Sequence, residues 1–249
     1  GILIKSGNVA EVTTMELASY MVGHEVIIGS APVSEYGEEM LTIENLSDNK
    51  NFFNMSLSVK RGEVLGITGL LGDGRSQLFG SVFGIYGGSY SGKVILDGKQ
   101  IHPVTPHEAV SHGIAYLPKN RKENAIIADM SIIDNGTIVI LRNFCKGLLL
   151  DKKAQKKVFD EQAHNLHIKM SDGEKLITAL SGGNQQKAVL AKWLISDPKV
   201  LILDNPTQGV DVGAKEEIYS IIGELAKSGI AIAEIEKLNP KRETTHAVT

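Results

Sequence analysis

The chain has 249 residues, enough for one large domain or two small ones, and its 42% apolar and 22% charged residues are those of an ordinary globular protein. The formal net charge is −3 and no basic run stands out, which gives no electrostatic reason to expect nucleic acid as a partner. No apolar stretch approaches the roughly 18 residues of a membrane-spanning helix, so we expect any membrane role to come through a partner protein.

The first part of the chain predicts the end of one unit and the start of another. Residues 1–26 begin with an apolar run, a turn and a helical pattern. Residues 27–39 are rich in Gly, Ser and Pro with little periodicity, which indicates a linker. A new domain is therefore expected to begin near residue 40. Residues 41–44 and 55–59 alternate polar and apolar side chains, as strands do.

A glycine-rich segment follows the apolar run at residues 64–68 and precedes a helical pattern at residues 77–83. A strand that stops abruptly, glycines that turn successive N–H groups toward an anion, and a facing helix N-terminus together form a phosphate-binding loop. The usual motif places a lysine on the β- and γ-phosphates and a hydroxyl on Mg²⁺, and here Arg75 and Ser76 stand in those places. The alternative is an ordinary glycine-rich turn, which the motifs further along disfavour.

The middle of the chain predicts a helical insertion. Residues 93–99 indicate another strand and a turn, after which helical patterns dominate from about 106 to 176. A short apolar strand at residues 114–117 and a polar loop at 118–124 interrupt these patterns. The lone cysteine, Cys145, excludes a disulfide within the chain, and we expect it to be a small residue of the apolar core.

The last part of the chain predicts the second half of a nucleotide site. Residues 180–186 read Leu-Ser-Gly-Gly-Asn-Gln-Gln and open a helix that runs to about residue 195, with Ser181 as a good N-cap. A buried strand at residues 200–203 ends in Asp204, which can hold Mg²⁺ at the carboxyl end of the strand. A helix at 212–227 and a strand from about residue 230 follow. Strands on continuous apolar runs that alternate with helices imply a largely parallel α/β sheet.

Residues 180–186 resemble the signature motif of ABC-type ATPases. Together with residues 206–215, the longer stretch 180–194 resembles the C-terminal half of the tandem ATPase subunits of bacterial monosaccharide importers, the ribose, galactose and xylose group. The resemblance runs from about residue 40 to at least 232. It implies a P-loop NTPase domain of the ABC type, with an antiparallel β subdomain and an inserted helical subdomain at about 106–176.

The same resemblance implies how the chain is divided. Residues 1–26 would be the tail of a preceding nucleotide-binding half, residues 27–39 a linker, and residues 40–249 a C-terminally truncated nucleotide-binding domain. The chain would then be a fragment of a longer subunit.

By this resemblance the domain binds ATP and Mg²⁺, and each site position matches a position of the family's motifs. The residues expected to bind nucleotide are Phe52, Phe53, Gly69, Gly72, Asp73, Gly74, Arg75, Ser76, Gln77, Ser181, Gly182 and Gly183. Phe52 or Phe53 would stack on adenine, and Ser76 and Asp204 would hold the metal. The catalytic positions are Asp204, Asn205, Lys119 and Glu236.

Several catalytic positions depart from the family pattern. Asn205 stands where the family has a catalytic glutamate and cannot act as a carboxylate base. Lys119 replaces an acid in the segment that senses the γ-phosphate, and Glu236 stands near the switch position, which is a histidine in most ABC ATPases. Arg75 differs from lysine in shape and hydration, although arginine is usual in this half of the group.

Three hypotheses remain open from the sequence. In the first, the chain is the energy-coupling subunit of a sugar importer; in the second, it is a nucleotide-binding half with little hydrolysis that supplies its signature to an active partner half. The partners would be the first half, membrane permease subunits and, indirectly, a sugar-binding protein, at the cytoplasmic face of the cell membrane. The third, an ABC-type protein of translation or DNA repair, predicts coiled-coil insertions or basic linkers, and the sequence contains neither.

Overall fold

The computed structural model describes residues 36–235 apart from residues 70, 71 and 148. The expected tail at residues 1–26, most of the linker, the C-terminal truncation and Glu236 lie outside the described residues. The proposed domain limits therefore stay predictions.

An antiparallel sheet opens the described part of the chain. Its strands lie in the order β2-β1-β4-β5, with the bounds Glu39–Ser47 for β1, Met55–Lys60 for β2, Ser91–Leu96 for β4 and Lys99–Ile101 for β5. The predicted alternation decides which face is buried: Leu41 and Ile43 of β1 are inaccessible to solvent, and Ile43 is paired with the equally buried Val94.

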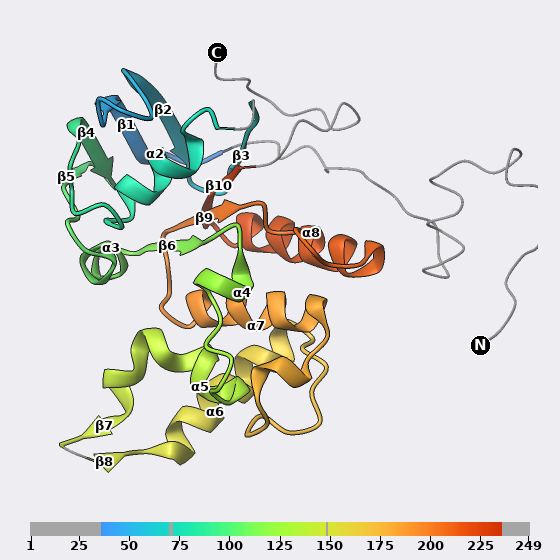
Figure 1. Ribbon diagram of the computed structural model, residues 1–249. Coiled ribbons are helices and arrows are strands. Elements are labelled where there is room, and N and C mark those ends of the chain that lie inside the picture. The colour runs from blue at the N-terminus through green and yellow to red at the C-terminus, as the bar shows by residue number, and fades with distance from the viewer. Residues whose placement is uncertain (1–35, 70–71, 148, 236–249) are drawn as a thin grey trace, which may run out of the picture.

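A parallel sheet forms the second layer. Its order is β3-β10-β9-β6, with the bounds Val64–Ile67, Ala231–Ile235, Val200–Asp204 and Ile114–Leu117 respectively. All residues of β6, β9 and β10 are buried, as expected for parallel strands covered on both faces. Two helices flank the sheets, α2 (Arg75–Val82) and α8 (Val212–Lys227) (Figure 1).

A helical lobe lies below the sheets in Figure 1, and α7 (Gly182–Leu194) runs between the two parts. The lobe also contains α5 (Ile132–Thr137), η2 (Ile138–Phe144), α6 (Lys152–Asn165) and η3 (Ile177–Ala179). Phe159 of α6 is fully buried, and its ring lies so close to Gly136 that a Cβ there would overlap it. Close packing of α5 on α6 thus builds a second part of the core.

Two short helices lie in the connections on either side of β6. The first is α3 (Pro106–His112), which joins the antiparallel sheet to β6 and whose N-cap Thr105 accepts a hydrogen bond from the N–H of Glu108. The second is α4 (Arg121–Asn124), which follows β6 at the junction of the sheets and the lobe (Figure 1). The polar loop expected at residues 118–124 is therefore partly wrong, because tertiary contacts stabilise a helical turn that has no apolar periodicity.

The expectation that Cys145 belongs to the core is also wrong, because Cys145 is exposed. It lies in β7 (Cys145–Lys146), which pairs with β8 (Leu149–Leu150) in a hairpin at the far end of the helical lobe (Figure 1). Two-residue strands with no second layer against them cannot bury their side chains, and Leu149 is 77% exposed.

None of the helices in the described part of the chain has both the length and the apolar character needed to span a membrane.

Candidate functional site

The carboxyl ends of the parallel strands bring the predicted site residues to one edge. Ile235, the last residue of β10, is aligned with Ile67 on one side and with Asp204 on the other. The phosphate-loop strand and Asp204 therefore end at the same level, two strand spacings or about 10 Å apart. On the far side, Leu117 of β6 is aligned with Leu203, which brings residues 118–119 to the same edge. Open α/β sheets bind ligands at this edge.

The loop between β3 and α2 has the backbone that an anion site needs. Gly72 and Gly74 have φ values of 86° and 88°, which favour glycine. A Cβ at Gly72 would meet open space, whereas one at Gly74 would overlap the carbonyl oxygen of Asn51. Helix α2 begins after Gly74 with no side-chain cap and no acid in its first turn. Its N-terminal N–H groups can therefore bind phosphate oxygens.

The side chain of Arg75 folds back onto its own loop. Its Nη1 and Nη2 donate to the carbonyl oxygens of Ile67 and Gly69, both at 3.0 Å, and its Nε lies 2.7 Å from the carboxylate of Asp73. That carboxylate lies over Gly69, where a Cβ would overlap it. A planar guanidinium fits two neighbouring carbonyl groups better than an ammonium does. A bound phosphate would have to compete with these partners for the cation.

Asp204 is 1% exposed and both of its carboxylate oxygens have partners. The side-chain amide of Asn205 donates to Oδ1 at 2.9 Å, and the hydroxyl of Tyr116 donates to Oδ2 at 3.4 Å. Burial and then the charge of Asp204 raise the pKa of Tyr116 well above its ordinary value, so the hydroxyl stays a donor. The sequence did not single out Tyr116, whose place beside Asp204 depends on the pairing of β6 with β9.

The donor set at this edge suits Mg²⁺ shared with a phosphate. Among the described residues no group of three His, Cys, Asp or Glu side chains could hold a metal ion by itself. The hydroxyl of Ser76 at the start of α2 and the carboxylate of Asp204 are hard oxygen ligands, and Mg²⁺ usually completes its shell with water and substrate phosphates. These two residues fit that pattern.

The two candidate aromatic residues differ in exposure. Phe52 is 3% exposed and belongs to the core beside Gly74, whereas Phe53 is 62% exposed and offers a free ring face. Asp48 fixes the turn before them by accepting hydrogen bonds from three consecutive backbone N–H groups, residues 50–52. Desolvation acts to raise the pKa of Asp48, but these bonds and one from the Asn51 side chain hold it well below its usual range.

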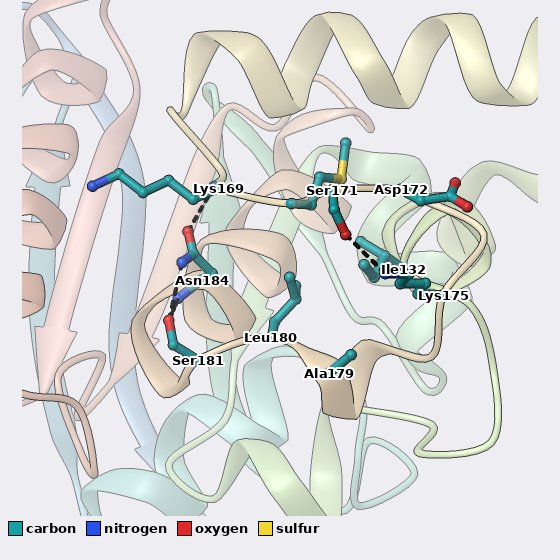
Figure 2. Close-up of a pocket in the computed structure, with 10 residues that line it drawn as sticks. Ile132, Lys169, Ser171, Asp172, Lys175, Ala179, Leu180, Ser181 and Asn184 are labelled. Carbon is teal, nitrogen blue, oxygen red and sulfur yellow. Dashed lines mark hydrogen bonds between the residues drawn. The ribbon is translucent and has the colours of Figure 1, made fainter.

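Hydrogen bonds and close packing fix the first turn of α7. Ser181 caps the helix and accepts a hydrogen bond from the side-chain amide of Asn184 at 3.0 Å, while the Asn184 oxygen accepts one from the N–H of Lys169 at 2.8 Å. Figure 2 shows this chain of contacts at the wall of a cavity of about 340 Å³. On another side, a Cβ at Gly183 would lie 2.5 Å from that of Ala214 in α8. Close packing of α7 on α8 thus requires this glycine.

The segment after β6 places Lys119 and Arg121 at the junction of the two parts. Lys119 is half-buried, and the predicted catalytic role of this residue stays a prediction. Arg121 is buried and donates to the carbonyl oxygens of Gln208 and Gly209, 87 and 88 residues further along the chain. Sequence reasoning gave Arg121 no contact of its own, since nothing local predicts a bond over that separation.

Comparison with known proteins shows which family has these site residues. The family model described as ABC transporter matches residues 52–208, which contain the phosphate loop, the first turn of α7 and Asp204. The chain belongs to the ABC transporter family. This ABC domain is 39% identical to the xylose import ATP-binding protein XylG of Geobacillus kaustophilus over 97% of the chain. It is 44% identical to the ribose import ATP-binding protein RbsA of Halalkalibacterium halodurans over 82% of the chain.

The ABC domain spans about half the length of these curated relatives, 49% of the first and 41% of the second. Among solved structures it is similar to MJ1267, an ATP-binding cassette of an ABC transporter, in its ADP conformation. That similarity has a TM-score of 0.68 and 24% identity and covers 81% of this chain and 83% of the other. The predicted ABC-type P-loop fold, with an antiparallel sheet beside a parallel one, is confirmed.

Proposed function

We propose that this domain is one nucleotide-binding half of an ATPase subunit that energises monosaccharide import. It binds ATP with Mg²⁺, hydrolyses little of it at its own phosphate loop, and supplies its signature segment to the ATP of a partner half. The sugar-import assignment is supported by the names of the relatives. The division of labour is supported mainly by one observation: Asn205, where a base would be needed, donates its amide to Asp204.

In this proposal the nucleotide lies along the carboxyl edge of the parallel sheet. The N–H groups of residues 72–77 and the start of α2 bind its phosphates, and Phe53 is the aromatic residue free to stack on adenine. Ser76 and Asp204 hold Mg²⁺, which neutralises phosphate charge when bound. Arg75 reaches a phosphate only by leaving the carbonyl groups of Ile67 and Gly69.

Weak hydrolysis follows from the groups at the edge. An amide cannot accept the proton of an attacking water as a carboxylate does, and the loss of a positioned base typically costs about 10²- to 10⁴-fold in rate. The amide of Asn205 is instead used in a hydrogen bond to Asp204, at 2.9 Å. The site therefore keeps the groups for binding and lacks the group for turnover. Glu236, near the switch position, lies outside the described residues.

The first turn of α7 is the part that the partner half would use. Ser181 and the N–H groups of Gly182 and Gly183 present a helix N-terminus, whose partial positive charge favours an anion. Donors that are already oriented stabilise charge as it develops in phosphoryl transfer. The remaining partners in this proposal are permease subunits and, through them, a sugar-binding protein. The place of action is the cytoplasmic face of the membrane.

Steady-state phosphate release by the purified chain tests the weak turnover, with Mg-ATP binding measured on the same sample. We expect measurable binding and negligible release. The Asn205→Glu variant restores a carboxylate beside Asp204 and should raise the rate, whereas Asn205→Gln keeps the amide and should not. A wild-type turnover near about 1 s⁻¹, ordinary for an enzyme, would contradict the proposal.

A further inference from the structure

Arg121 is a buried cation without a salt bridge to any described carboxylate. It is 7% exposed, its Nη1 donates to Gln208 at 2.6 Å, and its Nη2 donates to Gly209 at 3.0 Å, both through backbone carbonyl groups. Its Nε is buried and has no hydrogen-bond partner among the described residues. Burying an unpaired charge is costly, so the contacts that hold it must be specific ones.

Three segments meet at the guanidinium of Arg121. It belongs to α4, it bonds the loop that follows β9, and it touches the start of α7, where a Cβ at Gly182 would lie 2.9 Å from Nη2. Gly209 has a φ of 69°, a conformation that favours glycine. Gly182 leaves the guanidinium its space, whereas a Cβ at Gly209 would lie at an ordinary 3.6 Å from Nη1. A shift of any one of the three segments would break a contact made by this one side chain.

A second buried cation holds the opposite end of α4. Lys192 of α7 donates from its Nζ to the carbonyl oxygen of Ala125, the C-cap of α4, at 2.7 Å. Burial lowers the pKa of Lys192 to about 8. A four-residue helix is far too short to be stable by itself in water. The position of α4 therefore depends on Arg121 at its start and Lys192 at its end.

We propose that Arg121 is a positioning residue that makes α4, residues 208–209 and the first turn of α7 move as one body. The inference rests on the proposed function. The family resemblance also implies that residues 118–122 would contact the membrane subunit and that residues 209–211 would cross to the partner half. The body then links the permease contact to the nucleotide shared between the halves. An arginine is required because its fork reaches two successive carbonyl groups, whereas a lysine reaches one.

Hydrogen exchange on the purified chain tests whether Arg121 holds the three segments together. Three amides report on the three segments, and each donates to a backbone carbonyl: Ala125 to Arg121, Gln208 to Asn205, and Gln185 to Ser181. In Arg121→Gln these amides should exchange about tenfold faster, as expected for the loss of charge-assisted bonds. Arg121→Lys should be intermediate, and it keeps the test decisive if the Gln variant does not fold.

The matched control is Arg142→Gln, because Arg142 is exposed on the helical lobe and should leave all three rates unchanged. If Arg121→Gln and Arg121→Lys also leave the three rates unchanged, Arg121 does not hold the three segments together and the proposal is refuted.

The transporter arm of the experiment tests what Arg121 does in the assembled transporter. The tandem subunit is assembled with its permease in vesicles, and ATP turnover is measured with and without a binding protein loaded with D-xylose or D-ribose. In Arg121→Gln, the stimulation of ATP turnover by the loaded binding protein should be about tenfold smaller, while most of the basal turnover is kept. A merely structural defect would lower the basal and the stimulated turnover together. Stimulation equal to that of Arg142→Gln overturns the proposal. If the wild type shows no stimulated turnover, the proposed function fails, and the exchange rates still decide the role of Arg121.

Discussion

Two helices of the site begin at glycines: α2 follows Gly74, and α7 begins with Gly182 and Gly183. The polar side chains around the two helix starts make different contacts. At the edge, polar groups bind one another: Arg75 bonds its own loop, and Asn205 bonds Asp204. At α7, Asn184 of the helix itself bonds the cap Ser181 and the backbone of Lys169, and the first two residues of the helix are glycines without side chains. A helix N-terminus is open to an anion only where neighbouring charged groups do not compete for it.

This difference bears on how the two regions can work. At the phosphate loop a ligand must displace contacts that the chain already makes, which lowers affinity by the strength of those contacts. At the start of α7 a ligand adds contacts to a turn whose geometry is already fixed.

The largest effect is expected from Gly74→Ala, because the new Cβ would overlap the carbonyl of Asn51 in a backbone with φ of 88°. We expect a loss of about 3 kcal/mol in the free energy of unfolding, measured with chemical denaturant. Gly72→Ala is the matched control, since it has a similar φ of 86° and open space, and should cost about 1 kcal/mol. Equal losses would mean that close packing does not fix the loop.

A smaller effect concerns the helix that carries the signature. Because burial lowers the pKa of Lys192 from 10.5 to about 8, the unfolded chain binds the extra proton between these two values. Stability should therefore rise with pH across this window, by up to about 1.4 kcal/mol per pH unit from this group. Lys192→Met should remove that contribution in denaturant unfolding at several pH values. Lys122→Met, exposed on α4, should keep the wild-type slope; equal slopes in all three proteins would contradict the burial argument.

The smallest effect concerns the contact that holds Arg75. Asp73→Asn weakens its ion pair, so Arg75 should turn to phosphate more easily and ATP should bind about fivefold more tightly, or about 1 kcal/mol. Titration with a fluorescent ATP analogue measures the change. A double-mutant cycle separates two causes: the gain should vanish in an Arg75→Ala background if it comes from the released arginine. A gain that persists there would mean simple removal of a negative charge.

The sequence predicted the elements that rest on continuous apolar runs or on local capping. The strands that end at Ile67 and Asp204 and the helix that Ser181 begins lie where the pattern placed them. It failed for α4 and for the exposure of Cys145, because a polar helical turn and a two-residue strand carry no periodic signal.

The contacts within the site were the least predictable part. The inward fold of Arg75 depends on carbonyl groups at the end of β3, and Arg121 reaches a loop 87 residues away. The motif assigned residue types to places, but the partner of each side chain follows from tertiary structure. Whether Phe52 or Phe53 has a free ring was likewise decided by packing.

In the proposed function, this half matters more for the ATP of its partner than for its own. The most direct measurement is ATP turnover by the intact tandem subunit with its membrane partners, compared between Ser181→Arg and Arg75→Ala. The loss of the α7 cap alone costs only about 1 kcal/mol of stability, so thermal unfolding can verify that both variants are folded. We predict that Ser181→Arg abolishes turnover and that Arg75→Ala leaves a substantial part of it. If Arg75→Ala proves as damaging as Ser181→Arg, the two regions are equivalent and the account is contradicted.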